Sequence, residues 1–116
     1  MTDEQQRALE IYATTIKNCQ KMQPKFVPGT AQATLLTNRI AALQIVSGLV
    51  AGRDQAVAAA QLQAAVAPIE SIVHKTTVAR AKYAPGDAMY RRLTPMIAAM
   101  TLGLQVLQQR LAHQSR

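Results

Sequence analysis

KFVPGTAQATLLTNRIAALQIVSGLV, at residues 25–50, sets the architecture, because the chain repeats it as KYAPGDAMYRRLTPMIAAMTLGLQVL at residues 82–107. The two stretches align without a gap at an offset of 57 residues. Extended back to Ala8 and Ala65, the alignment contains 10 identities in 43 positions. A fixed period of this length indicates a repeated structural unit. The sequence therefore predicts two repeats, of about residues 3–52 and 54–112, within a single domain spanning residues 1–116.

Each repeat is predicted to be a helical hairpin closed by a short turn. The spacing of apolar residues predicts helices over about residues 3–23, 31–51, 55–81 and 88–112. The repeated turn contains Lys25, Phe26, Pro28 and Gly29 in the first repeat, and Lys82, Tyr83, Pro85 and Gly86 in the second. A Pro-Gly pair favours a type II turn, because Pro fixes φ at the first central position and Gly supplies a positive φ at the second.

Polar residues at the predicted helix starts are suited to capping. Thr2 followed by Gln5 predicts a capping box at the first helix. Thr30 and Asp87 are expected to cap the helices that follow the two turns, and Asp54 the helix that opens the second repeat. Thr30 and Asp87 occupy equivalent positions of the two repeats.

Two prolines fall inside the predicted helices. Because Pro lacks an amide hydrogen and its ring clashes with the preceding turn, it kinks or breaks a helix interior. Pro68 therefore predicts a kink or break near residues 65–68, and Pro95 predicts a kink in the last helix.

The distribution of apolar residues predicts the fold class. The helix over residues 31–51 is apolar on more than one face, which is typical of a helix enclosed on several sides. We expect this helix and the last one to be the most buried. One hairpin cannot bury such faces alone, whereas two hairpins related by a pseudo-twofold axis can. The sequence predicts an all-α four-helix bundle made of two repeated helical hairpins, with Gly48 and Gly103 allowing close helix approach.

Charge and composition limit the setting in which the protein acts. The formal net charge is +7, and a basic surface can attract nucleic acid, an acidic protein or anionic lipid. The single cysteine, Cys19, allows no intrachain disulfide and fits a reducing compartment. The N-terminus is polar and acidic, unlike a signal peptide. The uncharged stretches at residues 40–52 and 94–109 fall short of the ~20 apolar residues of a membrane span. We expect a cytoplasmic protein without a transmembrane segment.

No catalytic, metal or cofactor site is predicted. A di-metal bundle needs Glu and Glu-x-x-His ligands, and neither His74 nor His113 follows a Glu at that spacing. Cys19 is interpreted as a small buried hydrophobe rather than as a nucleophile. The Pro-Gly turns lack the glycine run and the Lys-Ser/Thr pair of a phosphate-binding loop. The sequence predicts a non-enzymatic protein.

Five basic residues are expected near the second turn, and they form the first candidate site: Lys75, Arg80, Lys82, Arg91 and Arg92. One interpretation is an anion or phosphate-backbone patch, and the other is a solvated helix end. The first repeat has Thr34 and Leu35 where Arg91 and Arg92 stand, so the patch departs from the repeat. No helix-turn-helix spacing and no pair of stacking aromatics supports base-specific recognition.

The repeated turn is the second candidate site. It could present Lys25 with Phe26, and Lys82 with Tyr83, to a partner as two related loops. The alternative, which we favour, is hairpin geometry, in which the aromatic side chain covers the end of the bundle.

Two resemblances bear on the fold. The stretches PIESIV at residues 68–73 and LLTNRIAALQI at 35–45, with the K-[FY]-x-P-G-[TD] turns, resemble a group of short bacterial helical proteins with a duplicated hairpin. This resemblance covers nearly the whole chain and implies no catalytic or binding residues. By architecture and charge alone, the chain is also similar to bacteriocin immunity proteins, which are small basic four-helix bundles.

The sequence does not identify one specific activity. We expect a non-enzymatic bundle that binds a protein partner, with a regulatory role and a homodimer as compatible readings. The alternatives are a nucleic-acid-associated protein that uses the basic patch, and an immunity-like protein that acts at the membrane face.

Overall fold

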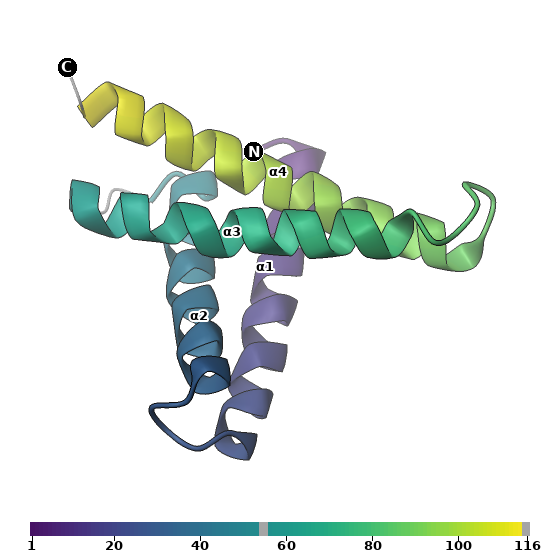
Figure 1. Cartoon of the computed structure of the whole chain (residues 1–116). Coiled ribbons are helices and arrows are strands. Elements are labelled where there is room, and N and C mark those ends of the chain that lie inside the picture. Colours follow the sequence, from purple (N-terminus) through teal and green to yellow (C-terminus); the bar gives the residue numbers. More distant parts are fainter. Residues whose placement is uncertain (54–55, 115–116) are drawn as a thin grey trace.

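The computed structural model describes residues 1–53 and 56–114, and this part of the chain is almost entirely helical (Figure 1). Its elements are α1 (Asp3–Met22), a short 3-10 turn η1 (Gln23–Lys25), α2 (Ala31–Val50), α3 (Ala59–Arg80) and α4 (Ala88–Gln114). The described ranges contain no strand. The predicted all-α bundle is therefore confirmed, with α3 beginning four residues later than expected.

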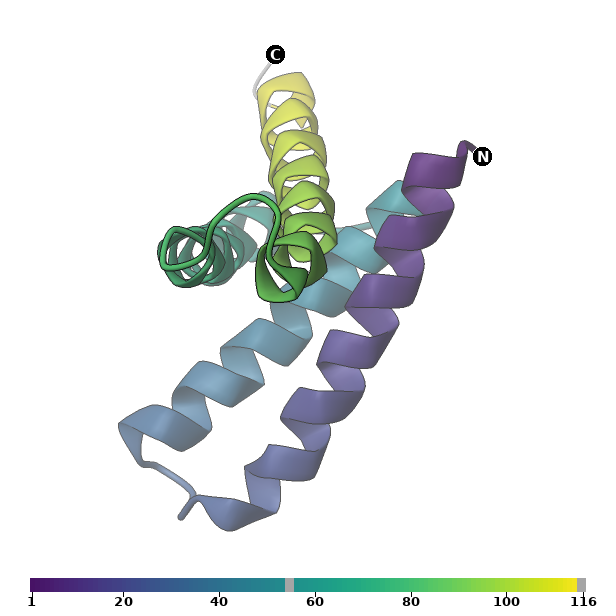
Figure 2. The ribbon, with the colours of Figure 1, turned by 90° about the vertical axis from the view of Figure 1, so that its right-hand side faces the viewer.

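The two hairpins cross instead of lying parallel. Figures 1 and 2 show the α3–α4 hairpin lying across one end of the α1–α2 hairpin, so that the turn end of each hairpin projects away from the crossing. The molecule measures 44 × 39 × 20 Å. Its shortest dimension matches two helices of about 10 Å diameter stacked on each other. The bundle thus consists of two layers, each made of one hairpin.

Each helix of the first repeat packs against a set of neighbours equivalent to that of the corresponding helix of the second repeat. α1 packs against α2 and α4, α3 packs against α4 and α2, and α2 also contacts α4. No Cα atom of α1 lies within 8 Å of a Cα atom of α3, both of which are fully described. Exchanging the repeats converts α1 into α3 and α2 into α4, and leaves this set of pairings unchanged. The pairings therefore have the symmetry that a pseudo-twofold axis through the α2–α4 contact would produce.

The main core lies where the hairpins cross. Its largest fully buried side chains come from all four helices: Tyr12, Leu43, Val46, Leu62, Ile69, Met100 and Leu107. α2 buries seven residues, whereas α4 buries four, as α3 does. α2 is the helix with the most buried residues, as expected. α4 is less buried than expected because its first turns extend past the crossing toward the projecting end.

α2 and α4 approach each other closely at Gly103. A Cβ atom there would lie 2.6 Å from Cγ1 of Val46 and 3.1 Å from the Tyr12 hydroxyl oxygen. Val46 occupies the position of the first repeat that Gly103 occupies in the second. A large residue from one repeat thus meets the smallest residue of the other at the crossing. The predicted role of Gly103 in close helix approach is confirmed.

The predicted caps of the first hairpin are present. The Thr2 hydroxyl accepts a hydrogen bond from the Gln5 amide, and the Gln5 side chain accepts one from the Thr2 amide, which completes the capping box. The Thr30 hydroxyl accepts a hydrogen bond from the Ala33 amide at 3.3 Å and caps α2. Asp54, the predicted cap of the third helix, lies outside the described residues.

The two turns differ in backbone conformation. In each, the amide of the last turn residue donates to the carbonyl three residues earlier. Gly29 has a φ of +88°, as a type II turn requires, whereas Gly86 does not have a positive φ. The type II prediction is confirmed for the first turn and wrong for the second. In the second turn the Asp87 carboxylate accepts a hydrogen bond from the Ala84 amide, and this side-chain bond stabilises a turn that does not need a left-handed glycine.

The prolines do not interrupt their helices. Pro68 lies inside a continuous α3, and Pro95 inside a continuous α4. Figure 1 shows α3 passing through this region as a single rod, so the predicted break near residues 65–68 is wrong. Ala65 and Ile69, on either side of Pro68, are almost fully buried. Tertiary packing of this face holds the helix together across the missing hydrogen bond.

α2 has the length and hydropathy of a membrane span. Among the described residues it is the one helix that meets these two criteria, with a mean hydropathy of 1.3 over its most apolar window. The core helix of a soluble protein meets the same criteria. The absence of a transmembrane segment therefore stays a prediction.

Candidate functional site

The crossed arrangement leaves an unusually large surface exposed. The accessible surface is 7363 Å², whereas a compact monomer of 12.6 kDa exposes about 6,200 Å². The radius of gyration, 14.7 Å, likewise exceeds the value of about 13.4 Å expected for a compact chain of this length. The excess surface of roughly 1,200 Å² is larger than the ~800 Å² that each partner buries in a typical protein–protein interface.

Large apolar side chains are exposed mainly at the projecting ends of the hairpins. The exposed set is Met1, Met22, Val27, Leu35, Val78, Tyr83 and Met89. Apart from Met1, all of these lie in or near one of the two turns. Single exposed apolar residues are ordinary, but a group of them at one end of an element marks an interaction surface.

Arg80 is held by its own hairpin. Its guanidinium lies over the Tyr90 ring, 4.8 Å from the centroid, and donates a hydrogen bond of 3.3 Å to the Thr94 hydroxyl. These contacts join the end of α3 to the beginning of α4. Arg80 therefore stabilises the second hairpin in addition to contributing positive charge.

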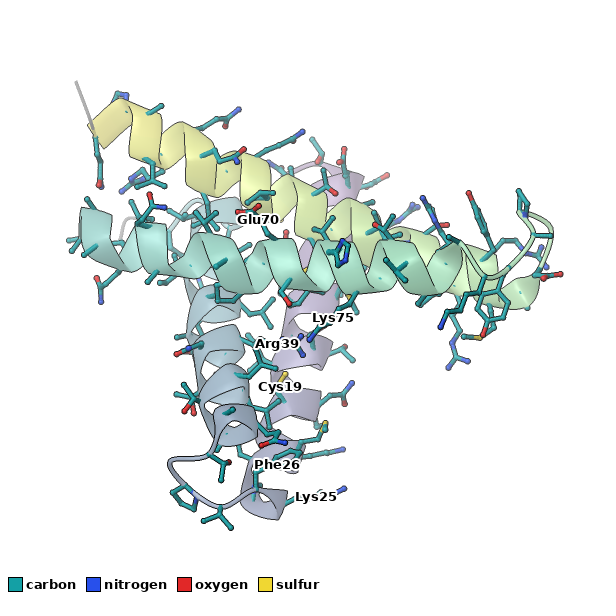
Figure 3. All side chains as sticks on the ribbon, in the orientation of Figure 1. Cys19, Lys25, Phe26, Arg39, Glu70 and Lys75 are labelled. Carbon is teal, nitrogen blue, oxygen red and sulfur yellow. The ribbon has the colours of Figure 1, made fainter. Side chains whose placement is uncertain are left out.

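The structure brings four of the five predicted basic residues to the second turn. Lys82, Arg91 and Arg92 are exposed there, next to Arg80. Lys75 lies seven residues before Lys82, a distance of about 10 Å along a helix. Figure 3 shows Lys75 extending from α3 toward the first hairpin. Lys75 thus belongs to a different surface from the other four.

The aromatic residues of the repeated turn have different surroundings. Phe26 is half-buried and packs against a small cluster formed by Cys19, Leu36 and Ile40, within the projecting end of the first hairpin. Tyr83, at the equivalent position, is 38% exposed. In the first repeat the aromatic side chain covers the hairpin end, whereas in the second it faces solvent.

Arg39, a residue that the sequence analysis did not select, lies on the inner side of the first hairpin. Its Nε atom is buried and has no hydrogen-bond partner among the described residues. Burial raises the pKa of the Cys19 thiol, and the nearby Arg39 charge partly opposes this rise. Figure 3 shows Arg39 and Cys19 in the angle below α3. The available signal was that Arg39 is the only charged residue of α2.

Two open grooves flank the α2–α4 crossing at equivalent places in the repeats. The groove between α1 and α4 has a volume of about 300 Å³, and the groove between α2 and α3 about 240 Å³. The first contains Glu4 and Arg7 where the second contains Gln61 and Ala64. Alanines form part of the lining of both grooves, and among the described residues neither groove contains a His or Cys side chain.

The described ranges contain no group of three or more His, Cys, Asp or Glu side chains that could hold a metal ion. Comparison with protein-family models, with curated proteins and with solved structures finds no match to this chain. The features with functional potential are therefore the projecting hairpin ends, with their exposed apolar residues, and the cationic side chains beside them.

Proposed function

We propose that this chain is a non-enzymatic, cytoplasmic protein-binding module that docks a macromolecular partner on its projecting hairpin ends. The observation that carries the proposal is the excess exposed surface of roughly 1,200 Å², which is sufficient for a standard interface. The exposed apolar residues lie on the parts of the hairpins that the crossing leaves uncovered. Burying them against a partner would supply the favourable free energy of association.

Charge indicates what kind of protein partner fits best. Two molecules of this chain each carry a formal charge of +7, so their basic surfaces repel at low salt. An acidic partner gains steering and complementarity from the same charges. A homodimer fits the exposed area equally well, but the charge favours an acidic protein.

The test compares two double variants of the tagged chain. In Met22→Glu/Leu35→Glu the exposed apolar residues of the first hairpin become acidic, and in Ala13→Glu/Gln44→Glu the same charge is placed at exposed positions away from the turn. Each bait is used to capture proteins from the source cell, and a captured protein is purified and titrated by calorimetry.

We expect the unmodified chain and the control to bind the purified partner equally, and the Met22/Leu35 variant to lose at least tenfold in affinity. Sedimentation measures self-association of the same three proteins. Equal binding of the partner by all three proteins would contradict the proposal. So would the result that capture finds no partner and sedimentation finds no dimer.

A nucleic-acid-binding function is the second candidate, and one observation favours it. Lys82, Arg91 and Arg92 are exposed together, and the nearest carboxylate, Asp87, accepts a backbone hydrogen bond. Binding of a labelled 25-base-pair duplex and of single-stranded RNA would weaken steeply between about 50 and 200 mM salt. Arg91→Ala/Arg92→Ala would reduce the salt dependence, whereas Arg7→Ala would not. No binding at low salt would remove this candidate.

A further inference from the structure

The inner angle between the two hairpins contains a partly buried cation, Arg39. The Arg39 Nε is buried and makes no hydrogen bond within the part of the chain that the structure describes. A buried donor left unpaired is unfavourable, because it has lost its hydration without gaining a partner. In most folded proteins such a group is paired by a protein group, by water or by a ligand.

Within residues 1–53 and 56–114, no carboxylate is placed to pair with Arg39. Residues 11–53 contain no Asp or Glu, so neither helix of the first hairpin offers one beside Arg39. Glu70 is the acidic residue of α3. It lines a groove with Leu104, on the α4 side of α3, and Figure 3 shows Glu70 there with Arg39 below α3. A carboxylate that pairs with Arg39 would therefore come from outside the described residues.

Apolar residues and a second cation accompany Arg39. Leu35 lies one helical turn before Arg39 on α2 and is 37% exposed, and Met22 lies one turn after Cys19 on α1 and is 42% exposed. Residues four apart on a helix share a face, so Leu35 and Arg39 present an apolar and a cationic group side by side. Lys75 extends toward this surface from α3. The angle thus combines apolar and cationic groups.

We infer that the inner angle receives an acidic amphipathic helix of a protein partner, with one carboxylate of that helix paired to Arg39. This inference rests on the proposed protein-binding function. The apolar face of the partner helix covers Met22 and Leu35, and an acidic residue one turn along it faces Lys75. Carboxylate is the natural complement of the guanidinium fork, and docking of a helix face between helices is a recurrent recognition mode.

The first measurement uses two synthetic 18-residue peptides of equal helicity. One carries Leu and Glu on a single face, and the other has Gln at every Glu position. Each is titrated into the ¹⁵N-labelled protein, and the Nε–H signal of Arg39 is followed by NMR. We expect the Glu peptide to shift this signal downfield and to bind at least tenfold more tightly than the Gln peptide. Equal binding of the two peptides, binding without a shift at Arg39, or no binding would overturn the inference.

Substitutions then test whether Arg39 is responsible. Arg39→Met is expected to lose at least tenfold in affinity for the Glu peptide, whereas Arg53→Met, which removes an exposed cation at the joint between the repeats, should bind as the unmodified chain does. Should Arg39→Met unfold, Arg39→Lys and Leu35→Glu carry the same test, with expected losses of about threefold and tenfold. Unchanged affinity in the folded variants would contradict the inference.

Two further outcomes separate this inference from the proposed function. A captured partner that binds Arg39→Met as tightly as the unmodified chain leaves the protein-binding function intact and overturns the inference. A 25-base-pair DNA duplex that shifts the Arg39 signal in place of the Glu peptide would assign the angle to nucleic acid and would also overturn it.

Discussion

The projecting ends of the two hairpins come from equivalent positions but are stabilised in different ways. In the first, Cys19, Leu36 and Ile40 form a small apolar cluster that Phe26 covers. In the second, the residues at the three cluster positions are Thr76, Leu93 and Ile97, all partly exposed. There the helices are joined by Arg80, which stacks on Tyr90 and bonds to Thr94.

The two repeats agree in side-chain burial near the crossing and differ at the turn ends. Near the crossing, equivalent positions have equivalent burial, as in Ala8 with Ala65 and Leu43 with Met100. At the turn ends the residues diverge in size, polarity and charge. The crossing is therefore the common structural element, and the ends are where the two repeats can bind different surfaces.

The largest expected effect comes from making the crossing identical in both repeats. Gly103→Val introduces the residue of the first repeat into a site where even a Cβ atom would lie 2.6 Å from Val46. We expect a loss of about 3 kcal/mol in the free energy of unfolding, because overpacking forces the helices apart. Urea unfolding followed by circular dichroism measures it.

The exchange of the two residues makes this test sharper. Val46→Gly alone should cost about 3 kcal/mol, from a cavity and from glycine in a helix. The double variant Val46→Gly/Gly103→Val returns one large and one small residue to the crossing, so its loss should be smaller than the sum of the two by at least about 1 kcal/mol. Strict additivity would mean that the two positions do not oppose each other. Thr101→Val, at an exposed position of α4, should change stability by less than about 0.5 kcal/mol.

The crossing also shows how much of the fold is accessible from sequence. The duplication and the apolar spacing predict four helices in two hairpins, because both signals are local. The angle between the hairpins is set by which side chains interdigitate, such as Gly103 with Val46, and the sequence contains no direct signal of that pairing. The break predicted at Pro68 failed for the same reason, since packing of Ala65 and Ile69 overrides a local preference.

The next effect concerns Tyr12, which the second repeat replaces with Ile69. Its hydroxyl donates a hydrogen bond to the Ala99 carbonyl inside the core. Tyr12→Phe removes this buried hydrogen bond, and we expect a loss of about 1 to 2 kcal/mol at pH 7. Ile69→Val, which removes one methyl group and no hydrogen bond, should cost about 1 kcal/mol.

The pH dependence distinguishes the hydroxyl from its packing. Burial raises the pKa of Tyr12 above its ordinary value, so the folded chain keeps the phenol neutral where the unfolded chain ionises it. Ionisation of Tyr12 should therefore cause no pH dependence of the free energy of unfolding below about pH 10. Above that pH, the free energy of unfolding should fall as the pH rises. The difference in stability between the unmodified chain and Tyr12→Phe must shrink above that pH. A constant difference would show that the phenol is not buried.

The candidate site was less predictable than the fold. Lys82 lies in the short turn that precedes α4, and Arg91 and Arg92 lie near the start of α4. These residues are close in sequence, so their grouping could be predicted from the sequence. Arg39 became a candidate only through its position in three dimensions, where its buried Nε lies beside a residue of α1. A single charge in an apolar helix is a signal of such a group, but it does not say which neighbour will pair with it.

The smallest effect compares the two glycines of the repeated turn. Gly29 has a φ of +88° and an open surrounding, so Gly29→Ala meets no atom but places a side chain in a left-handed backbone. We expect a loss of about 1 kcal/mol. Gly86→Ala meets no atom either and lacks a positive φ, so it should change stability by less than about 0.5 kcal/mol.

Thermal and urea unfolding of the two variants test whether the two turns have the same backbone conformation. Equal losses would mean that both turns share one backbone conformation, and that the carboxylate of Asp87 does not substitute for a left-handed glycine. A larger loss for Gly29→Ala than for Gly86→Ala, together with a loss of stability in Asp87→Ala, would show that the two turns are stabilised by different interactions. The glycine retained in both turns would then be required in only one of them.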